Sequence, residues 1–356
     1  MLHALVRKVS RVLDAAENVG IVADIDADGI SGAATLCEAF RVEEGDVRFP
    51  PGGFYGVPEE LLREMLESYD VVVAVDVTPP RVAGGRDRVI VIDHHPSPAR
   101  YPMTINPHHV RALPKNTSAS ALTGMIAHRA GRLRRPWLPL IGAAGDGLDR
   151  GPVYETLARL VDPELLTPPP GRKLNPIQDA AATVNAARRV EYHKGAERAL
   201  EVLLLADSPH EVAESHLARY RGKVRAERGT WSERASRTVH VVLGVGYAEV
   251  HSEVDIEGLV AQDLLRRKGL RCAVVYNSVR KPCGLLKVSG RARGFPVNEL
   301  LTEMARWLDG ARAGGHPGAA ALHFRSGDPK EAFNRATDEL LSGEPIDPES
   351  TAPRRR

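Results

Sequence analysis

The chain has 356 residues, of which 43% are hydrophobic and 26% are charged, a composition typical of a folded globular protein with room for two or more domains. Its formal net charge is only +2, so the chain as a whole lacks the strong positive charge that would indicate nucleic-acid binding. The three cysteines are odd in number and lack the spacing of a metal site. Neither a signal peptide nor an apolar run long enough to span a membrane is found. We therefore expect a cytoplasmic protein.

Residues 1–150 alternate between predicted helices and predicted strands. Apolar spacing predicts helices over residues 2–13, 31–42, 57–68 and 117–131. Short β-branched runs predict strands over residues 19–25, 46–50, 70–77 and 87–95, and residues 138–146 read as a further buried segment. This alternation predicts an α/β domain with a doubly wound parallel sheet covered on both faces.

The rest of the chain divides into three parts. Residues 151–236 are expected to form a helical connecting region. A second, smaller α/β domain is expected over residues 237–326, with strands at 238–246, 271–278 and 284–292 and helices at 256–269 and 297–308. Residues 327–356 are expected to form a helix near 329–342 and a Pro-rich, polar, disordered tail.

Acidic residues and histidines follow four of the buried segments. They are Asp24, Asp26 and Asp28 after the first strand, Asp76 after residues 71–75, Asp93, His94 and His95 after residues 89–92, and Asp146 after residues 141–145. Each segment is read as a strand that ends at the edge where open α/β sheets bind ligands. Clustered carboxylates need hard divalent cations, imidazole shifts the preference from Mg²⁺ toward Mn²⁺, and the number of ligands suits two ions.

Three ordinary explanations compete with a metal site. The D-x-D-x-D-G spacing is also that of a calcium-binding EF-hand loop, but that loop needs a glutamate at its twelfth position, where this chain has Thr35, and a helix in front of it. Any one of the aspartates could be a helix cap or a turn residue, and a His-His pair could be solvent-exposed. Four such segments in one domain make the metal site the stronger interpretation.

The motifs DIDADGIS, VVVAVD, VIDHH and IGAAGD, in that order, resemble motifs I to IV of the DHH phosphoesterase superfamily. The later segments LKVSGRARG and GARAGGHPGAAA resemble a DHHA1 domain. Family II pyrophosphatases and small oligonucleotide hydrolases have a histidine where this chain has Val22, whereas the D-x-D-A-D-G form resembles RecJ-like single-strand exonucleases, in the short form found in archaea.

The resemblance implies a role for each matching residue. It implies that Asp24, Asp26, Asp28, Asp76, His94 and Asp146 are metal ligands for two Mn²⁺ or Mg²⁺ ions. Asp93 is expected to orient His94, and His95 to contact the scissile phosphate or a metal-bound oxygen. Water activated by the two metals would then attack the phosphorus. In the DHHA1-like segment, a Gly-Gly-His loop of Gly314, Gly315 and His316, together with Ser289, Arg291 and Arg293, is expected to bind substrate.

The function expected from this resemblance is a metal-dependent exonuclease that releases mononucleotides from single-stranded DNA or RNA. A hydrolase of short oligonucleotides or cyclic dinucleotides is the first alternative. The second alternative is a replication scaffold of the Cdc45 type with little activity. The expected partners are a single strand or a short oligonucleotide, and also a replication or repair protein for which residues 150–235 offer a docking surface.

Overall fold

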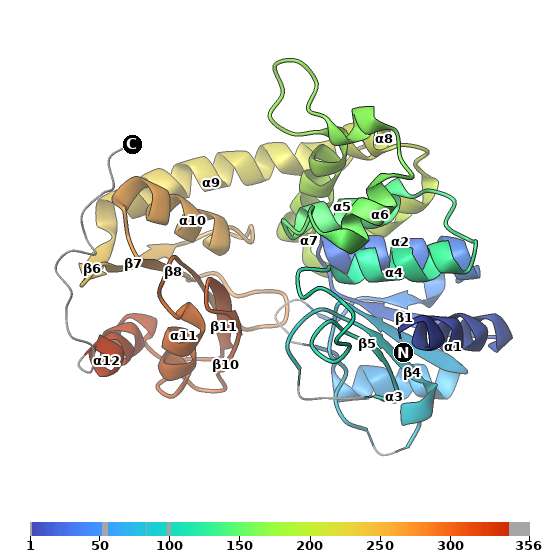
Figure 1. Cartoon of the computed structure of the whole chain (residues 1–356). Coiled ribbons are helices and arrows are strands. Elements are labelled where there is room, and N and C mark those ends of the chain that lie inside the picture. Colours follow the sequence, from blue (N-terminus) through green and yellow to red (C-terminus); the bar gives the residue numbers. More distant parts are fainter. Residues whose placement is uncertain (1, 52–55, 83, 98–100, 342–356) are drawn as a thin grey trace. The chain divides into compact units, whose positions relative to one another are not determined.

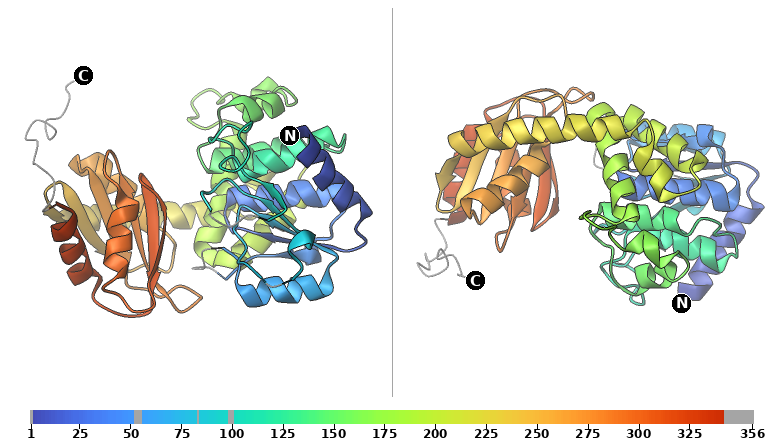
Figure 2. Two further views of the ribbon diagram at one scale, coloured as in Figure 1. Left: turned by 60° about the horizontal axis from the view of Figure 1, so that its bottom comes forward. Right: turned by 90° about the horizontal axis from the view of Figure 1, so that it is seen from above.

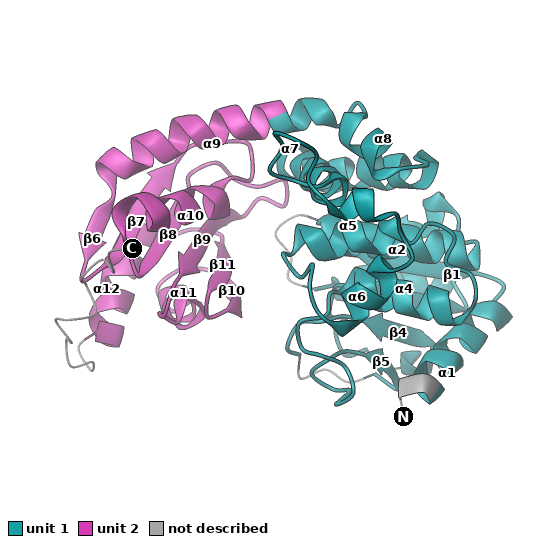
Figure 3. Ribbon diagram, turned by 45° about the horizontal axis from the view of Figure 1, so that its top comes forward, with its two compact units in different colours: residues 1–221 teal, residues 222–356 magenta. Residues whose placement is uncertain are grey.

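The computed structural model describes residues 2–51, 56–82, 84–97 and 101–341. The chain divides into two compact units, Met1–Arg221 and Gly222–Arg356, which are described separately below (Figure 3). The disordered tail expected at the C-terminus lies outside the described residues from 342 onward. No helix in the described ranges is both long enough and apolar enough to cross a membrane.

The first unit contains a five-stranded sheet in which every pair of neighbours is parallel. Its strand order is β2-β1-β3-β4-β5, which confirms the predicted doubly wound parallel sheet. The order reverses between β1 and β3, and such a switch point is where open α/β sheets bind their ligands. The strands are β1 (Val19–Ala23), β2 (Val47–Arg48), β3 (Val71–Val75), β4 (Val89–Ile92) and β5 (Met103–Ile105).

Helices cover both faces of this sheet (Figures 1 and 2). On one face, α3 packs Leu62 and Met65 against side chains of β1, β3 and β4. On the other face α2 lies so close that a Cβ on Gly32 would be 2.6 Å from a methyl group of Val75. The helices of this unit are α1 (Leu2–Ala15), α2 (Ala27–Phe40), α3 (Glu59–Ser68), α4 (Ala119–Arg129), α5 (Trp137–Gly145), α6 (Pro152–Ala158), α7 (Pro176–Leu205) and α8 (Pro209–Glu214), with short 3₁₀ turns at Glu44–Asp46, Arg86–Arg88 and Pro163–Leu166.

One buried segment differs from its predicted role as a strand. Residues 137–145 form α5, so Asp146 caps the C-terminus of a helix instead of ending a strand. The cause is close helix packing by small residues. A Cβ on Gly142 would lie 2.3 Å from the Ser120 hydroxyl oxygen, and a Cβ on Gly145 would lie 2.6 Å from the Ala27 side chain. A short apolar run rich in small residues fits a buried helix as well as a buried strand.

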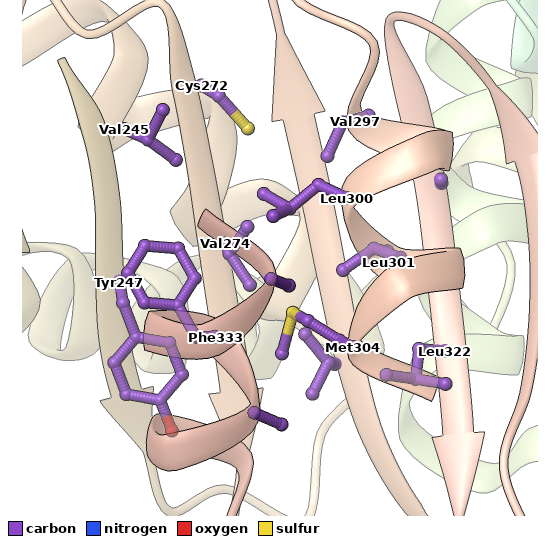
Figure 4. Close-up of a cluster of buried hydrophobic side chains, with 14 of the residues drawn as sticks. Val245, Tyr247, Cys272, Val274, Val297, Leu300, Leu301, Met304, Leu322 and Phe333 are labelled. Carbon is purple, nitrogen blue, oxygen red and sulfur yellow. The ribbon is translucent and has the colours of Figure 1, made fainter. Parts of the chain in front are cut away.

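The second unit contains a six-stranded mixed sheet in the order β10-β11-β9-β8-β7-β6. Its core lies between the sheet and two helices, where Leu300 and Met304 of α11 and Phe333 of α12 meet Tyr247 and Val274 (Figure 4). The strands are β6 (His240–Val242), β7 (Val245–Val250), β8 (Cys272–Asn277), β9 (Leu286–Ala292), β10 (Arg312–His316) and β11 (Ala319–Phe324). The helices are α9 (Ala218–Thr238), which begins in the first unit, α10 (Glu257–Lys268), α11 (Val297–Ala305) and α12 (Pro329–Leu341).

Two details of the second unit differ from the sequence expectations. The strand expected at 238–246 is two strands, because Leu243 and Gly244 both take positive φ angles and turn the chain between β6 and β7. The Gly-Gly-His segment is not a loop but the end of β10, and the turn follows at residues 317–318.

Candidate metal centre

The ends of three parallel strands bring acidic residues to one edge of the first sheet. The ladder continues one residue past each strand, because Asp24, Asp76 and Asp93 donate their backbone N–H groups to Val75, Ile92 and Ile105 at 3.1, 2.8 and 3.2 Å. The three aspartates therefore stand side by side at the carboxyl edge, on both sides of the switch point. This arrangement fixes where their side chains begin.

The loop from β1 to α2 supplies two more carboxylates. Asp26 is the N-cap of α2 and accepts hydrogen bonds from the N–H groups of Asp28 and Gly29 at 3.0 and 3.3 Å. The turn is tight, since a Cβ on Gly29 would lie 2.3 Å from the carbonyl oxygen of Asp24. Glycine is therefore required where the helix passes over the end of the strand.

Asp28 is fully buried and held by the N-terminus of α4. Its carboxylate accepts hydrogen bonds from the N–H groups of Ala119 and Ser120 at 2.7 and 3.0 Å, and from the Ser120 hydroxyl. Exposed N–H groups at a helix N-terminus favour a negative charge. The side chain that the sequence assigned to a metal is thus fixed by a second helix that the motif does not include.

His94 lies at the centre of the carboxylates. Its Nε2 atom is 3.2 Å from Asp146 Oδ2, 3.3 Å from Asp76 Oδ1 and 3.8 Å from Asp28 Oδ2. Asp146 reaches this point from the end of α5, so α5 contributes to the site in place of the fourth strand end that the sequence predicted. The structure brings together all six side chains that the sequence predicted to be metal ligands.

Burial and mutual repulsion raise the pKa values of three carboxyl groups in this cluster. Burial and the nearby charge of Asp26 raise the pKa of Asp24 to about 7 and that of Asp146 to about 6. Burial, together with Asp28 and Asp26, raises the pKa of Asp76 well above its usual value. Burial alone would lower the pKa of His94, but Asp146 and Asp28 raise it to about 9. The cluster therefore favours added positive charge.

Two buried atoms show that the cluster is incomplete as a protein structure alone. Among the described residues, Asp76 Oδ1 and His94 Nε2 are buried without a hydrogen bond, and both point into the cluster. Three overlapping groups have ligand atoms within 4.8 Å of one another: Asp24, Asp26 and Asp76; Asp28, His94 and Asp146; and Asp76, His94 and His95. Oxygen and imidazole donors in this arrangement fit divalent cations such as Mn²⁺ and Mg²⁺.

Asp93 has a different partner from the one expected. The sequence reasoning had Asp93 orient the ring of His94. In the structure its Oδ1 lies 3.0 Å from Nδ1 of His95 and accepts a hydrogen bond from the backbone N–H of His94, while Thr78 donates to its other oxygen. Burial would raise the pKa of Asp93, but the His95 and Thr78 contacts lower it. Asp93 therefore stays ionised and fixes the ring of His95.

Sequence reasoning missed three residues that hold the site. Ser120 anchors Asp28, as described above. Asn185 of α7 accepts a hydrogen bond from the N–H of Ala27 at 3.2 Å, beside the D-x-D segment. The positive charge of Arg188, one turn further along α7, opposes the rise in the pKa of Asp24. No local signal marks any of them, because each reaches the site from a helix distant in sequence.

The predicted substrate residues gather in the second unit. Ser289, Ala321 and Gly314 pair across β9, β11 and β10, and the next row on the same face is Arg291, Ala319 and His316. The guanidinium of Arg291 lies against α10, where a Cβ on Gly258 would be 2.7 Å from it. Gly315 has a φ of +130°, and Arg293 is exposed just beyond β9.

No family model and no curated protein matches the sequence. A manganese-bound RecJ exonuclease structure matches with a TM-score of 0.71 and 20% identity, over 97% of this chain and 95% of that one. A manganese-bound RecJ from Thermus thermophilus matches with a TM-score of 0.70 and 20% identity, over 97% of this chain but only 55% of that one.

Two proteins of other kinds have a similar fold. A pGpG-specific phosphodiesterase from Vibrio matches with a TM-score of 0.50 and 14% identity, over 92% of this chain and 98% of that one. Cdc45 from Entamoeba histolytica matches with a TM-score of 0.56 and 10% identity, over 94% of this chain and 97% of that one. The chain thus has the RecJ-like DHH fold, with the DHH and DHHA1 architecture predicted from its motifs.

Proposed function

We propose that this chain is a divalent-metal-dependent phosphodiesterase that acts as an exonuclease, releasing mononucleotides from single-stranded DNA or RNA. The main support for the proposal is that carboxylate and imidazole atoms from four segments converge around Asp76 Oδ1 and His94 Nε2, two buried atoms that form no hydrogen bond. The similarity to RecJ exonuclease supports the substrate class.

The positions of the residues suggest which of them would bind metal and which would contact the phosphate. Asp24, Asp26 and Asp76 would hold one ion, and Asp28, His94 and Asp146 a second. The two groups adjoin, because His94 Nε2 lies 3.3 Å from Asp76 Oδ1. Two bound divalent ions supply activation of water and neutralisation of charge on the phosphate. His95, whose ring is fixed by Asp93 and whose side chain is 43% exposed, would donate a hydrogen bond to a phosphate oxygen. Burial opposes but Asp93 and Asp76 favour its protonated form, raising its pKa to about 10.

The second unit is proposed to hold the nucleotide. Gly314, Ala319 and Ala321 are small and half-buried, so a phosphate would have room on this face of the sheet, and Ser289, Arg291 and His316 border them. An Arg guanidinium binds phosphate through two parallel hydrogen bonds. The variant His316→Ala is therefore expected to raise KM more than it lowers kcat.

Two other functions have specific support. The similarity to a pGpG-specific phosphodiesterase favours a hydrolase of short oligonucleotides or cyclic dinucleotides, which would use the same metal centre. The similarity to Cdc45 favours a replication scaffold, a role that needs no metal ligands. Because all six predicted ligands are present and converge, we place the scaffold third.

The test is hydrolysis of single strands that carry a label at the 5′ or the 3′ end, with Mn²⁺, resolved at single-nucleotide length. We expect stepwise release of mononucleotides by the unaltered protein and none by Asp76→Asn, which removes one charge from the centre. Asp87→Asn, an exposed residue of the same type, is the matched control and should retain full activity. Cleavage of dinucleotides alone would favour the phosphodiesterase, and no cleavage of either would favour the scaffold.

A further inference from the structure

The second unit contains a long segment of one charge sign. Residues 264–298 include nine Lys and Arg and no Asp or Glu, although the whole chain is nearly neutral. The basic residues are Arg266, Arg267, Lys268, Arg271, Arg280, Lys281, Lys287, Arg291 and Arg293. Their positions in the fold divide them between the two ends of the sheet.

The two central lysines are neutralised inside the unit. Lys281 pairs with Glu257 and Lys287 pairs with Asp255, and all four side chains are largely buried. Arg280 donates to the carbonyl of Gly284 in the turn between β8 and β9. Lys281 and Lys287 therefore serve the fold of the β8–β9 hairpin and offer little charge to a ligand, whereas Arg280 is exposed and keeps its charge at the hairpin turn.

The remaining basic residues meet at the other end of the sheet. Arg266, Arg267 and Lys268 form the last turn of α10, and Arg271 stands just before β8. Arg293, just after β9, donates its backbone N–H to the carbonyl of Arg271 at 2.8 Å, because Cys272 and Ala292 pair in the ladder. We call Arg266, Arg267, Lys268 and Arg271 the basic end of the second unit.

Three of the four side chains of the basic end are exposed, and of these Arg267 interacts with the charge of Asp263. Within the described residues, none of Arg266, Arg267 and Lys268 forms an ion pair. The acid that precedes them, Asp263, already binds Arg228 at 2.6 Å and the Ser232 hydroxyl at 2.8 Å. Basic residues favour a helix C-terminus, which explains one or two of them. It does not explain the lack of acids through β8 and β9.

The basic end continues directly from residues proposed to hold substrate. Arg293 lies beside Arg271 and is two residues from Arg291, a separation of about 7 Å along a strand. Arg291 in turn pairs through Ala319 with His316. A chain of phosphates that reaches Arg291 and Arg293 would therefore meet the basic end next.

We propose that the basic end binds the phosphodiester backbone of a single strand beyond the nucleotides at Ser289, Arg291 and His316. This rests on the proposed function and deepens it, because it makes strand length the property that the second unit recognises. Backbone contacts by Lys and Arg give affinity without sequence preference and weaken with salt. On this proposal, a dinucleotide that occupies Ser289, Arg291 and His316 has no further phosphates for the basic end to bind.

The test variant is Arg266→Gln with Arg267→Gln and Lys268→Gln, since glutamine keeps helix propensity and removes three charges. The matched control is Arg7→Gln with Lys8→Gln and Arg11→Gln, three exposed charges of α1 in the first unit. Both sets are made in the Asp76→Asn protein, so that binding is measured without hydrolysis. The probe is a labelled single strand of about 20 nucleotides, titrated at several salt concentrations.

We expect the basic-end variant to lower the slope of log affinity against log salt by about 2, the value for three lost contacts to a single strand. Its affinity should then change about 16-fold less than that of the unaltered protein between about 50 and 200 mM salt. The α1 control should keep the full slope. In proteins with Asp76 intact, hydrolysis of a dinucleotide should be equal in all three.

Three results would overturn the proposal. The first is a salt slope equal to that of the α1 control, and the second is an equal loss of dinucleotide hydrolysis in the basic-end variant. The third concerns vesicles of anionic phospholipid. If the unaltered protein binds them, and the basic-end variant loses this binding but still binds the single strand, the basic end contacts a membrane surface instead. If the unaltered protein binds strands but cleaves nothing, the proposed exonuclease fails while the basic end is still tested by the salt slope.

Discussion

Without bound metal, the clustered carboxylates should lower the stability of the protein, so that a variant with one charge fewer is more stable. Asp76 is 3% exposed and has a φ of +59°, a conformation that asparagine adopts more readily than most residues. Its nearest repulsive partners include Asp26, whose ligand atom lies within 4.8 Å. We therefore expect Asp76→Asn to abolish hydrolysis and, at the same time, to stabilise the protein when metal is removed.

The size of the effect follows from opposing charges. Repulsion between two carboxylates at about 4.8 Å is worth about 3.5 kcal/mol at an effective dielectric constant of about 20. His95, with Nδ1 3.5 Å from Asp76 Oδ1, offsets part of this. Because the pKa of Asp76 is raised overall, repulsion and burial outweigh the attraction. A net gain of about 1–3 kcal/mol in the free energy of unfolding follows, or about 2–4 °C in Tm per kcal/mol.

The pH dependence has a definite sign. A carboxyl whose pKa is raised by folding destabilises the folded state only where the unfolded chain has lost its proton, above about pH 4. The gain from Asp76→Asn should therefore be present at neutral pH and vanish as the pH falls to about 4.

The assay is thermal unfolding in excess chelator, for the unaltered protein, Asp76→Asn and the exposed control Asp87→Asn, followed by addition of Mn²⁺. We expect Mn²⁺ to raise the Tm of the unaltered protein and of Asp87→Asn much more than that of Asp76→Asn, because a ligand stabilises only the state that binds it. A lower metal-free Tm for Asp76→Asn than for the unaltered protein would refute the reasoning, as would an equal response of all three proteins to Mn²⁺.

Three further predictions concern the residues around the two sites. Ser120→Ala removes a hydrogen bond to Asp28, so Mn²⁺ affinity measured by calorimetry should fall about 10-fold or more, whereas Ser236→Ala, which removes an exposed hydrogen bond within α9, should leave it unchanged. Gly29→Ala would place a Cβ 2.3 Å from the carbonyl oxygen of Asp24, and we expect a loss of about 2 kcal/mol or more in urea unfolding together with lost hydrolysis; full activity would contradict the tight turn. Burial lowers the pKa of His323 to about 3, so unfolding takes up a proton below about pH 6.5 and the free energy of unfolding falls as the pH drops. His323→Gln should reduce the slope of this free energy against pH by up to about 1.4 kcal/mol per pH unit. An unchanged slope would exclude His323 as its source.

The sequence predicted best those parts of the fold that local pattern determines. The β-branched runs that became β1, β3 and β4 are buried on both faces, and an aspartate directly after each marked the edge where the ladder continues. The spacing of acids in residues 24–28 also predicted a turn into a helix that presents carboxylates. These features depend on neighbours within a few residues, so the sequence contains them.

The parts that were missed depend on packing between distant segments. Residues 137–145 have no polar face and many small side chains, and only their contacts with α2 and α4 make them a helix. Ser120 and Asn185 stabilise Asp28 and the start of α2, yet each is an ordinary polar residue in its own helix. The partner of Asp93 depends on the rotation of two adjacent rings, which spacing does not specify.

The basic residues of the second unit also show that local sequence does not determine contacts between distant segments. Lys287 and Arg291 are four residues apart on one strand and point to the same face, so the sequence gives no reason to treat them differently. Lys287 pairs with Asp255 from the segment before α10, whereas Arg291 donates to the carbonyl of its neighbour Gly290 and lies against Gly258 of α10. A charge paired with a buried acid stabilises the fold, and Arg291 is the residue of this strand that we propose to contact phosphate. The contacts that distinguish Lys287 from Arg291 come from α10 and the segment before it, so the packing of this helix separates two residues that the strand sequence does not.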